Sequence, residues 1–83
     1  MTASMFSLLP PRSQLRMTLA EGLLVAHRWG QDGLVHLYHL ADGRTGYFAE
    51  VGHEMERNRL AVLHSFGRVE TKENYCWHFQ APQ

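Results

Sequence analysis

The sequence has few of the features that would narrow its function. It holds a single cysteine, Cys76, among 83 residues, so a disulfide framework within the chain is excluded and a reducing, cytoplasmic setting is predicted. Its formal net charge is zero, because eight basic side chains balance eight acidic ones. A neutral chain has no general attraction for nucleic acid or for an anionic membrane. It also lacks the self-repulsion that keeps copies apart, which favours a homodimer.

Long apolar runs are also missing. No stretch approaches the roughly 20 apolar residues that cross a bilayer, and the N-terminus lacks the pattern of a secretory signal, so no membrane contact is expected. A chain of this length predicts one small domain over residues 1–83. Within it, residues 1–12 are expected to form a loose N-terminal segment or an edge strand. Pro10 and Pro11 would end such a strand, because neither has an N–H to donate to a sheet.

The strongest structural pattern lies in residues 23–51. Two Asp-Gly pairs, Asp32-Gly33 and Asp42-Gly43, separate three runs rich in apolar and aromatic residues. Asp-Gly favours two-residue hairpin loops, because Gly adopts positive φ freely and Asp tolerates it. The segment therefore predicts three antiparallel strands in a meander.

These loops would also fix which side chains share a face. With Asp-Gly as the loop residues, Trp29 opposes His36 and Tyr38 opposes Tyr47, and directly opposed residues lie on the same side of a sheet. One face then carries aromatic and histidine side chains, among them His27, Trp29, His36, Tyr38 and Tyr47. The other face carries apolar groups and two charges, among them Arg28, Leu37, Phe48 and Glu50.

The rest of the chain extends the sheet and supplies its cover. Residues 59–66 alternate as a strand does, and residues 13–20 are also interpreted as a strand, although Ser13 could begin a helix. Residues 69–79 fit either a strand or a helix; we favour the helix, because a sheet with two apolar faces needs cover. The predicted fold is α+β, an antiparallel β-meander of four to five strands with one short C-terminal helix packed on one face.

Six histidines are the one compositional oddity. His27 and His36 share a face, and His64 would join them if its strand presents the Leu60 side there. Three imidazoles suit Zn²⁺, and Cys76 or His78 could complete the set. However, no Cys-x-x-Cys or His-Glu-x-x-His motif is present. We therefore predict no metal and no cofactor, and keep a histidine-based metal-binding or pH-responsive domain as an alternative.

Catalytic and nucleic-acid patterns are weak. Cys76 and His78 lack a third group to orient them, and Glu54 and Glu56 lie in a polar segment without apolar surroundings. The chain is therefore not expected to be an enzyme, and a small hydrolase or transferase is the second alternative. The arginines are scattered and matched by acids, so nucleic acid is not an expected partner.

A binding surface is the favoured interpretation. Tyr and Trp are enriched where proteins meet, and one short helix would leave one apolar sheet face larger than monomers usually expose. We predict a small intracellular protein-binding module that acts by occupying a partner's surface and self-associates. An adaptor or inhibitor of bacterial, phage or mobile-element origin would fit that size. The predicted binding surface consists of Trp29, Tyr38, Tyr47, His27, His36, Phe48 and Leu37.

Overall fold

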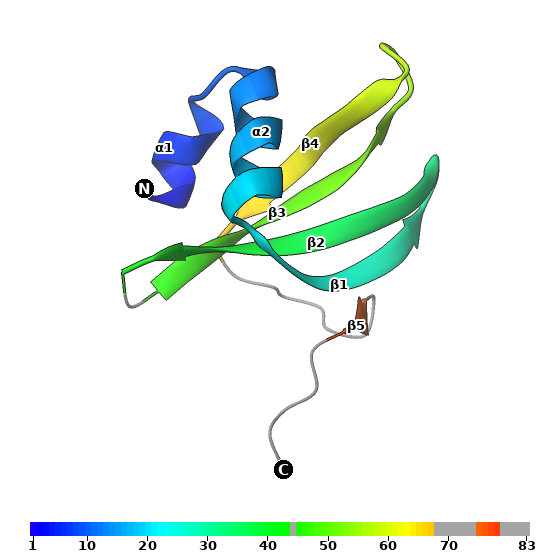
Figure 1. Cartoon of the computed structure of the whole chain (residues 1–83). Coiled ribbons are helices and arrows are strands. Elements are labelled where there is room, and N and C mark those ends of the chain that lie inside the picture. The colour runs from blue at the N-terminus through cyan, green and yellow to red at the C-terminus, as the bar shows by residue number, and fades with distance from the viewer. Residues whose placement is uncertain (44, 68–74, 79–83) are drawn as a thin grey trace.

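The described residues form an antiparallel sheet, preceded by two helices at the N-terminal end of the chain. The computed structural model describes residues 1–43, 45–67 and 75–78. Its elements are α1 (Ala3–Ser7), α2 (Pro11–Glu21), β1 (Leu23–Gly30), β2 (Gly33–Asp42), β3 (Thr45–Glu54), β4 (Arg59–Phe66) and β5 (Cys76–Trp77) (Figure 1). The five strands lie in the order β4-β3-β2-β1-β5, and every neighbouring pair is antiparallel. The predicted α+β class and antiparallel meander are confirmed.

The helices lie where the sequence was interpreted as loose chain and strand. Residues 3–7 form α1, and residues 13–20 lie inside α2, so the strand predicted there is wrong. Pro11 occupies the first turn of α2, where its missing N–H is not needed. The alternation of Leu15, Met17 and Leu19 is too short to separate a strand from a helix. In the described residues, no helix is long and apolar enough to cross a membrane.

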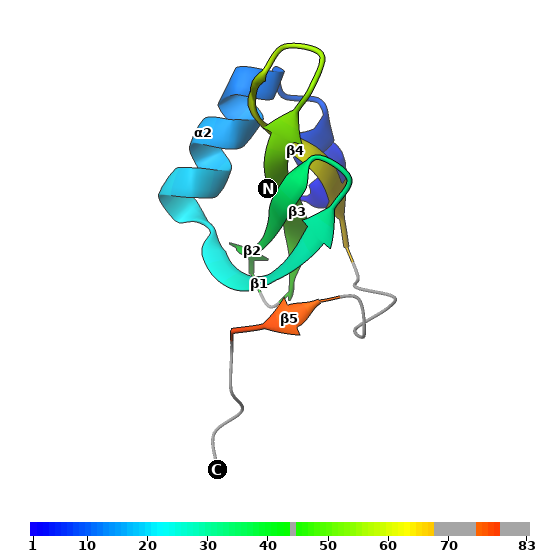
Figure 2. The ribbon, with the colours of Figure 1, turned by 90° about the vertical axis from the view of Figure 1, so that its right-hand side faces the viewer.

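The predicted C-terminal helix is not confirmed. Of residues 69–79, the structure describes 75–78, and this part contains the short strand β5. β5 pairs with β1 through Ala26–Trp77 and His27–Cys76 (Figure 2). The remainder of the predicted helix lies outside the described residues. The cover that the prediction required is supplied by α1 and α2, from the other end of the chain.

The core lies between the helices and one face of the sheet, here named the helix-side face. Phe6 of α1 is completely buried against Leu40, Tyr47 and Ala49. The Phe6 and Tyr47 rings are 5.3 Å apart between centroids. The N-terminal segment therefore packs into the sheet as part of the main core.

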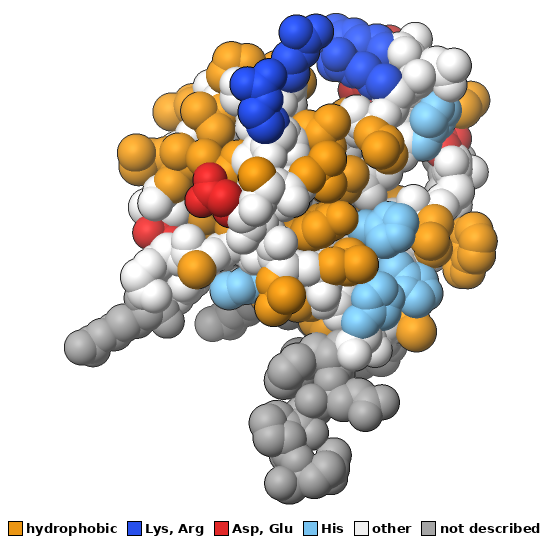
Figure 3. Space-filling model, in the orientation of Figure 1, with side chains coloured by type: hydrophobic (Ala, Val, Ile, Leu, Met, Phe, Trp, Pro, Cys, Tyr) orange, Lys and Arg blue, Asp and Glu red, His pale blue; other side chains and the backbone are white. Residues whose placement is uncertain are grey.

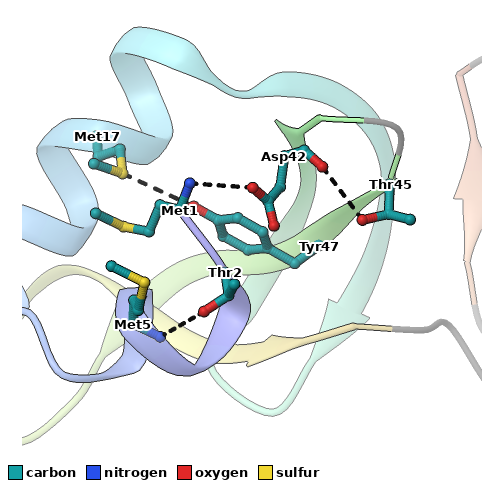
Figure 4. Close-up of polar contacts among 7 residues, drawn as sticks. All are labelled: Met1, Thr2, Met5, Met17, Asp42, Thr45 and Tyr47. Atoms are coloured by element: carbon teal, nitrogen blue, oxygen red, sulfur yellow. Dashed lines mark hydrogen bonds and ion pairs between the residues drawn. The ribbon is translucent and has the colours of Figure 1, made fainter.

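Polar contacts fix the helices at the end of the sheet where β2 meets β3 (Figure 4). The Tyr47 hydroxyl donates to Sδ of Met17 in α2 at 3.9 Å. The Met1 ammonium lies 3.2 Å from the Asp42 carboxylate, and the Thr2 hydroxyl caps α1 by accepting from the Met5 N–H. Both helices are therefore tied to the same β2–β3 hairpin.

The hairpins fold close to the predicted positions, with a shift in register. Gly30 pairs with Gly33, and Asp42 pairs with Thr45, so Trp29 opposes Leu34 instead of His36. Gly33 and Gly43 have φ values of 119° and 62°, which glycine adopts without strain. Each register shift is an even number of residues, so the predicted faces are retained. The exception lies before a bulge in β1, where Leu24 opposes Tyr38 and joins the helix-side face.

Candidate functional site

The helix-side face is covered at only one end. The helices pack over Leu40 and Tyr47, whereas the end near the β1–β2 turn has no helix over it (Figure 1). Trp29 lies at this end and is 78% exposed, opposite the half-buried Leu34. Figure 3 shows imidazoles gathered over β1 and β2, bordered by hydrophobic side chains. An aromatic and histidine surface therefore remains accessible.

Three imidazoles come together at this surface, and we name His27, His36 and His78 the histidine site. His27 and His36 are direct cross-strand partners. Nδ1 of His27 and Nε2 of His78 share a hydrogen bond of 2.5 Å, and their ring centroids are 4.7 Å apart. The backbone N–H of His78 also donates to the Val25 carbonyl at 2.8 Å. The residue after β5 is thus held to β1 by both its backbone and its ring.

The three metal candidates from the sequence do not converge. His27 and His36 share a face, but His64 opposes Glu50 on the opposite face of the sheet. A bulge where β3 pairs with β4 separates the Val51–Val62 pair from the Glu50–His64 pair, and it turns His64 to the other side. Across residues 1–43, 45–67 and 75–78, no three His, Cys, Asp or Glu side chains are grouped to hold a metal ion.

The opposite face holds a buried ionic cluster, which we name the Glu50 cluster. Glu50 is 3% exposed, and its carboxylate accepts two hydrogen bonds from Arg28, at 2.7 Å from Nε and 3.1 Å from a terminal nitrogen. The Tyr75 hydroxyl donates to the same carboxylate at 2.5 Å. Sequence reasoning placed Arg28 and Glu50 on one face. It missed Tyr75, which approaches only through the long-range pairing of β5.

The electrostatics of this cluster favour the ionised carboxylate. Burial alone would raise the pKa of Glu50, but hydrogen bonds from Arg28 and Tyr75, with the charges of Arg28 and His64, outweigh it and lower the pKa below 4.5. Burial, together with the hydrogen bond to Glu50 and its charge, raises the pKa of Tyr75 to about 12. Tyr75 therefore stays protonated at neutral pH and can keep donating to Glu50.

The other predicted binding residues lie deeper. Tyr47 is buried in the helix-side core, and Tyr38 is half-buried against it. Leu37 is completely buried on the opposite face, where it pairs with Glu50. Phe48 is half-buried on the opposite face, where its ring stacks on Phe66 at 5.9 Å and meets His39 edge-on at 5.1 Å. Among the predicted residues, Trp29 is the one that exposes most of its side chain, flanked by the partly exposed His27 and His36.

Comparison with known protein families, curated proteins and solved structures finds no match for this chain. Its function has therefore to be inferred from the geometry of its own residues. The two arrangements with defined geometry are the accessible surface around Trp29, which includes the histidine site, and the buried Glu50 cluster.

Proposed function

We propose that this protein is a small intracellular protein-binding module of adaptor or inhibitor type, which works without catalysis and associates with itself through the Trp29 end of β1. The observation that carries the proposal is the exposure of Trp29, at 78%. A tryptophan on a sheet surface loses a large apolar area from water when a partner covers it. Tryptophan is also among the residues that contribute most to binding at protein interfaces.

The edge of β1 supports self-association. β5 pairs with β1 only at Ala26 and His27, so within the described residues the outer edge of Trp29 and Gly30 has no strand partner. Free edges of this kind pair with strands of other chains. Two copies related by a two-fold axis would join their β1 edges in antiparallel fashion and bring the two Trp29 side chains together. The zero net charge leaves little repulsion between copies.

The test is the mass of the protein in solution, measured by size-exclusion chromatography with light scattering. The wild-type chain should have the mass of a dimer, and Trp29→Ser should have the mass of a monomer. Because Trp29 is exposed, the substitution should change the free energy of unfolding by no more than about 0.5 kcal/mol. Met55→Ser removes an exposed apolar side chain from the β3–β4 turn and should remain dimeric. A monomeric wild-type chain at high concentration would refute self-association.

A second candidate function, a pH-responsive domain, is favoured by the hydrogen bond between His27 and His78. Two imidazoles share such a bond when one of the two facing nitrogens carries a proton and the other does not, and they repel each other when both rings are charged. The groups that face this pair are His36 from β2 and Cys76 from β5. Acidification is therefore expected to release β5 from β1.

This expectation is checked by amide hydrogen exchange of Trp77 and His78 at about pH 7 and about pH 5. Protection of the His78 N–H, which donates to Val25, should fall at the lower pH. In His27→Asn the protection should be weak at both pH values, because the pairing of the two rings is lost. His53→Asn, which changes a histidine near the C-terminal end of β3 whose ring bonds Asn58 and not the His27–His78 pair, should respond as the wild type does. Equal protection of β5 in wild-type protein at both pH values would count against this candidate.

A further inference from the structure

A second surface lies on the helix-side face toward the other edge of the sheet from Trp29, between the start of α2 and the start of β4. It is a groove of about 330 Å³ lined by Pro11, Arg12, Leu15, Arg59, Leu60 and Ala61. Four of these residues are apolar and two carry guanidinium groups. The volume is at the low end for small-molecule sites, so it suits one or two side chains of a peptide.

The positive charge at the groove exceeds the negative charge of the acidic side chain that pairs with it. Arg12 is exposed and forms no ion pair within the described part of the chain. Arg57 and Arg59 both approach one oxygen of Glu54, at 3.9 Å and 3.6 Å. Figure 3 shows Lys and Arg side chains gathered across the top of the molecule, above the start of α2 and the β3–β4 turn. A ligand with carboxylates beside its apolar groups would complement this charge.

The backbone beside the groove can also take part. β4 is the last strand of the sheet, and among the described strands its one neighbour is β3. Its outer edge at residues 59–61 therefore presents N–H and C=O groups without a strand partner. An extended peptide satisfies such groups by adding a strand, while its alternate side chains enter adjacent pockets.

We propose that this groove binds an extended peptide segment of a partner protein, with an apolar side chain flanked by carboxylates. The apolar side chain would contact Leu15 and Leu60, and the carboxylates would pair with Arg12 and Arg59. Single-stranded nucleic acid is disfavoured because none of the lining residues is aromatic, so the groove has no ring on which a base could stack. This goes beyond the proposed function, since an adaptor that dimerises at β1 would keep the β4 groove free for a second partner.

The test is fluorescence polarisation with labelled heptapeptides. The probe alternates Glu and Leu; a second peptide has Lys in place of every Glu, and labelled oligothymidine is the third ligand. The acidic peptide should bind, the basic peptide should not, and raising the salt concentration should weaken binding. Arg12→Glu should weaken binding of the acidic peptide by about tenfold or more. The fold should tolerate this change, since an acid in the first turn of a helix is favourable.

Arg16→Glu is the matched control, because Arg16 is exposed one turn further along α2 and does not line the groove. The Arg16→Glu variant should retain most of the affinity for the acidic peptide. The Leu60→Asp variant should lose that affinity. Equal losses in the two arginine variants would show that only the overall charge matters and would overturn the proposal. Absence of binding by the acidic peptide, or tighter binding of oligothymidine, would overturn it as well.

Discussion

Replacing Arg28 with Met is expected to lower the free energy of unfolding by roughly 3–5 kcal/mol, the largest effect we predict on the opposite face. The reason lies in the Glu50 cluster. The Glu50 carboxylate is 3% exposed and takes two of its three side-chain hydrogen bonds from Arg28. Met keeps the apolar stem of the arginine but leaves a buried negative charge without its cation.

A double variant separates the loss of the ion pair from a simple loss of packing. In Arg28→Met combined with Glu50→Leu, no charge remains buried, and apolar groups of similar volume occupy the site. Replacing a buried pair in this way is often neutral or stabilising. Urea unfolding at neutral pH should therefore find the double variant more stable than the single one. If the stability lost in the double variant equals the sum of the losses in the two single variants, Arg28→Met and Glu50→Leu, the pair is not coupled and the cluster has been misinterpreted.

The pH dependence gives an independent check on Glu50. Its pKa in the folded state lies below 4.5, so its ionisation stabilises the fold above that value. This contribution is lost as the pH falls from 4.5 through the lowered pKa of the folded state. In Arg28→Met the hydrogen bonds and the charge of Arg28 no longer lower the Glu50 pKa, and Tyr75 and His64 remain, so we expect burial to raise that pKa. The stability that the variant loses relative to wild type should then shrink as the pH falls. A parallel pH profile for wild type and variant would contradict this account.

The sheet could be predicted from the sequence because its signals are local. Gly33 and Gly43 mark the hairpins through their positive φ, and side chains alternate with a period of two. An even shift in register leaves every face unchanged, so the error in pairing Trp29 did not affect its side of the sheet. The helices could not be predicted in the same way. α1 has five residues and α2 buries Thr18, whose hydroxyl bonds back to the Gln14 carbonyl, rather than a large apolar stripe.

The histidine site shows where sequence reasoning stops. The approach of His27 and His36 follows from a hairpin and was predicted. The position of His64 depends on a bulge between β3 and β4 that no local pattern announces. His78 meets His27 only because β5 returns to the edge of β1 across 51 residues of sequence. Contacts of that range are set by the packing of the whole chain.

The second large effect is expected on the helix-side face, from Phe6→Ala. Phe6 is completely buried among Leu40, Tyr47 and Ala49, and its removal should cost about 3–5 kcal/mol through lost apolar contact and the cavity left behind. α1 has only five residues and cannot be stable on its own. Losing its one buried side chain should therefore also release the N-terminal segment, which amide exchange and limited proteolysis would detect.

Two matched variants show whether the effect belongs to the core. Leu8→Ala removes an apolar side chain that is 83% exposed just after α1, and it should leave stability within about 0.5 kcal/mol of wild type. Phe48→Ala removes the same ring from a half-buried site on the opposite face and should cost less than Phe6→Ala. If Phe6→Ala were no more costly than Leu8→Ala, α1 would not be docked on Tyr47 in solution. The main core would then have to be rebuilt from α2 and the sheet alone.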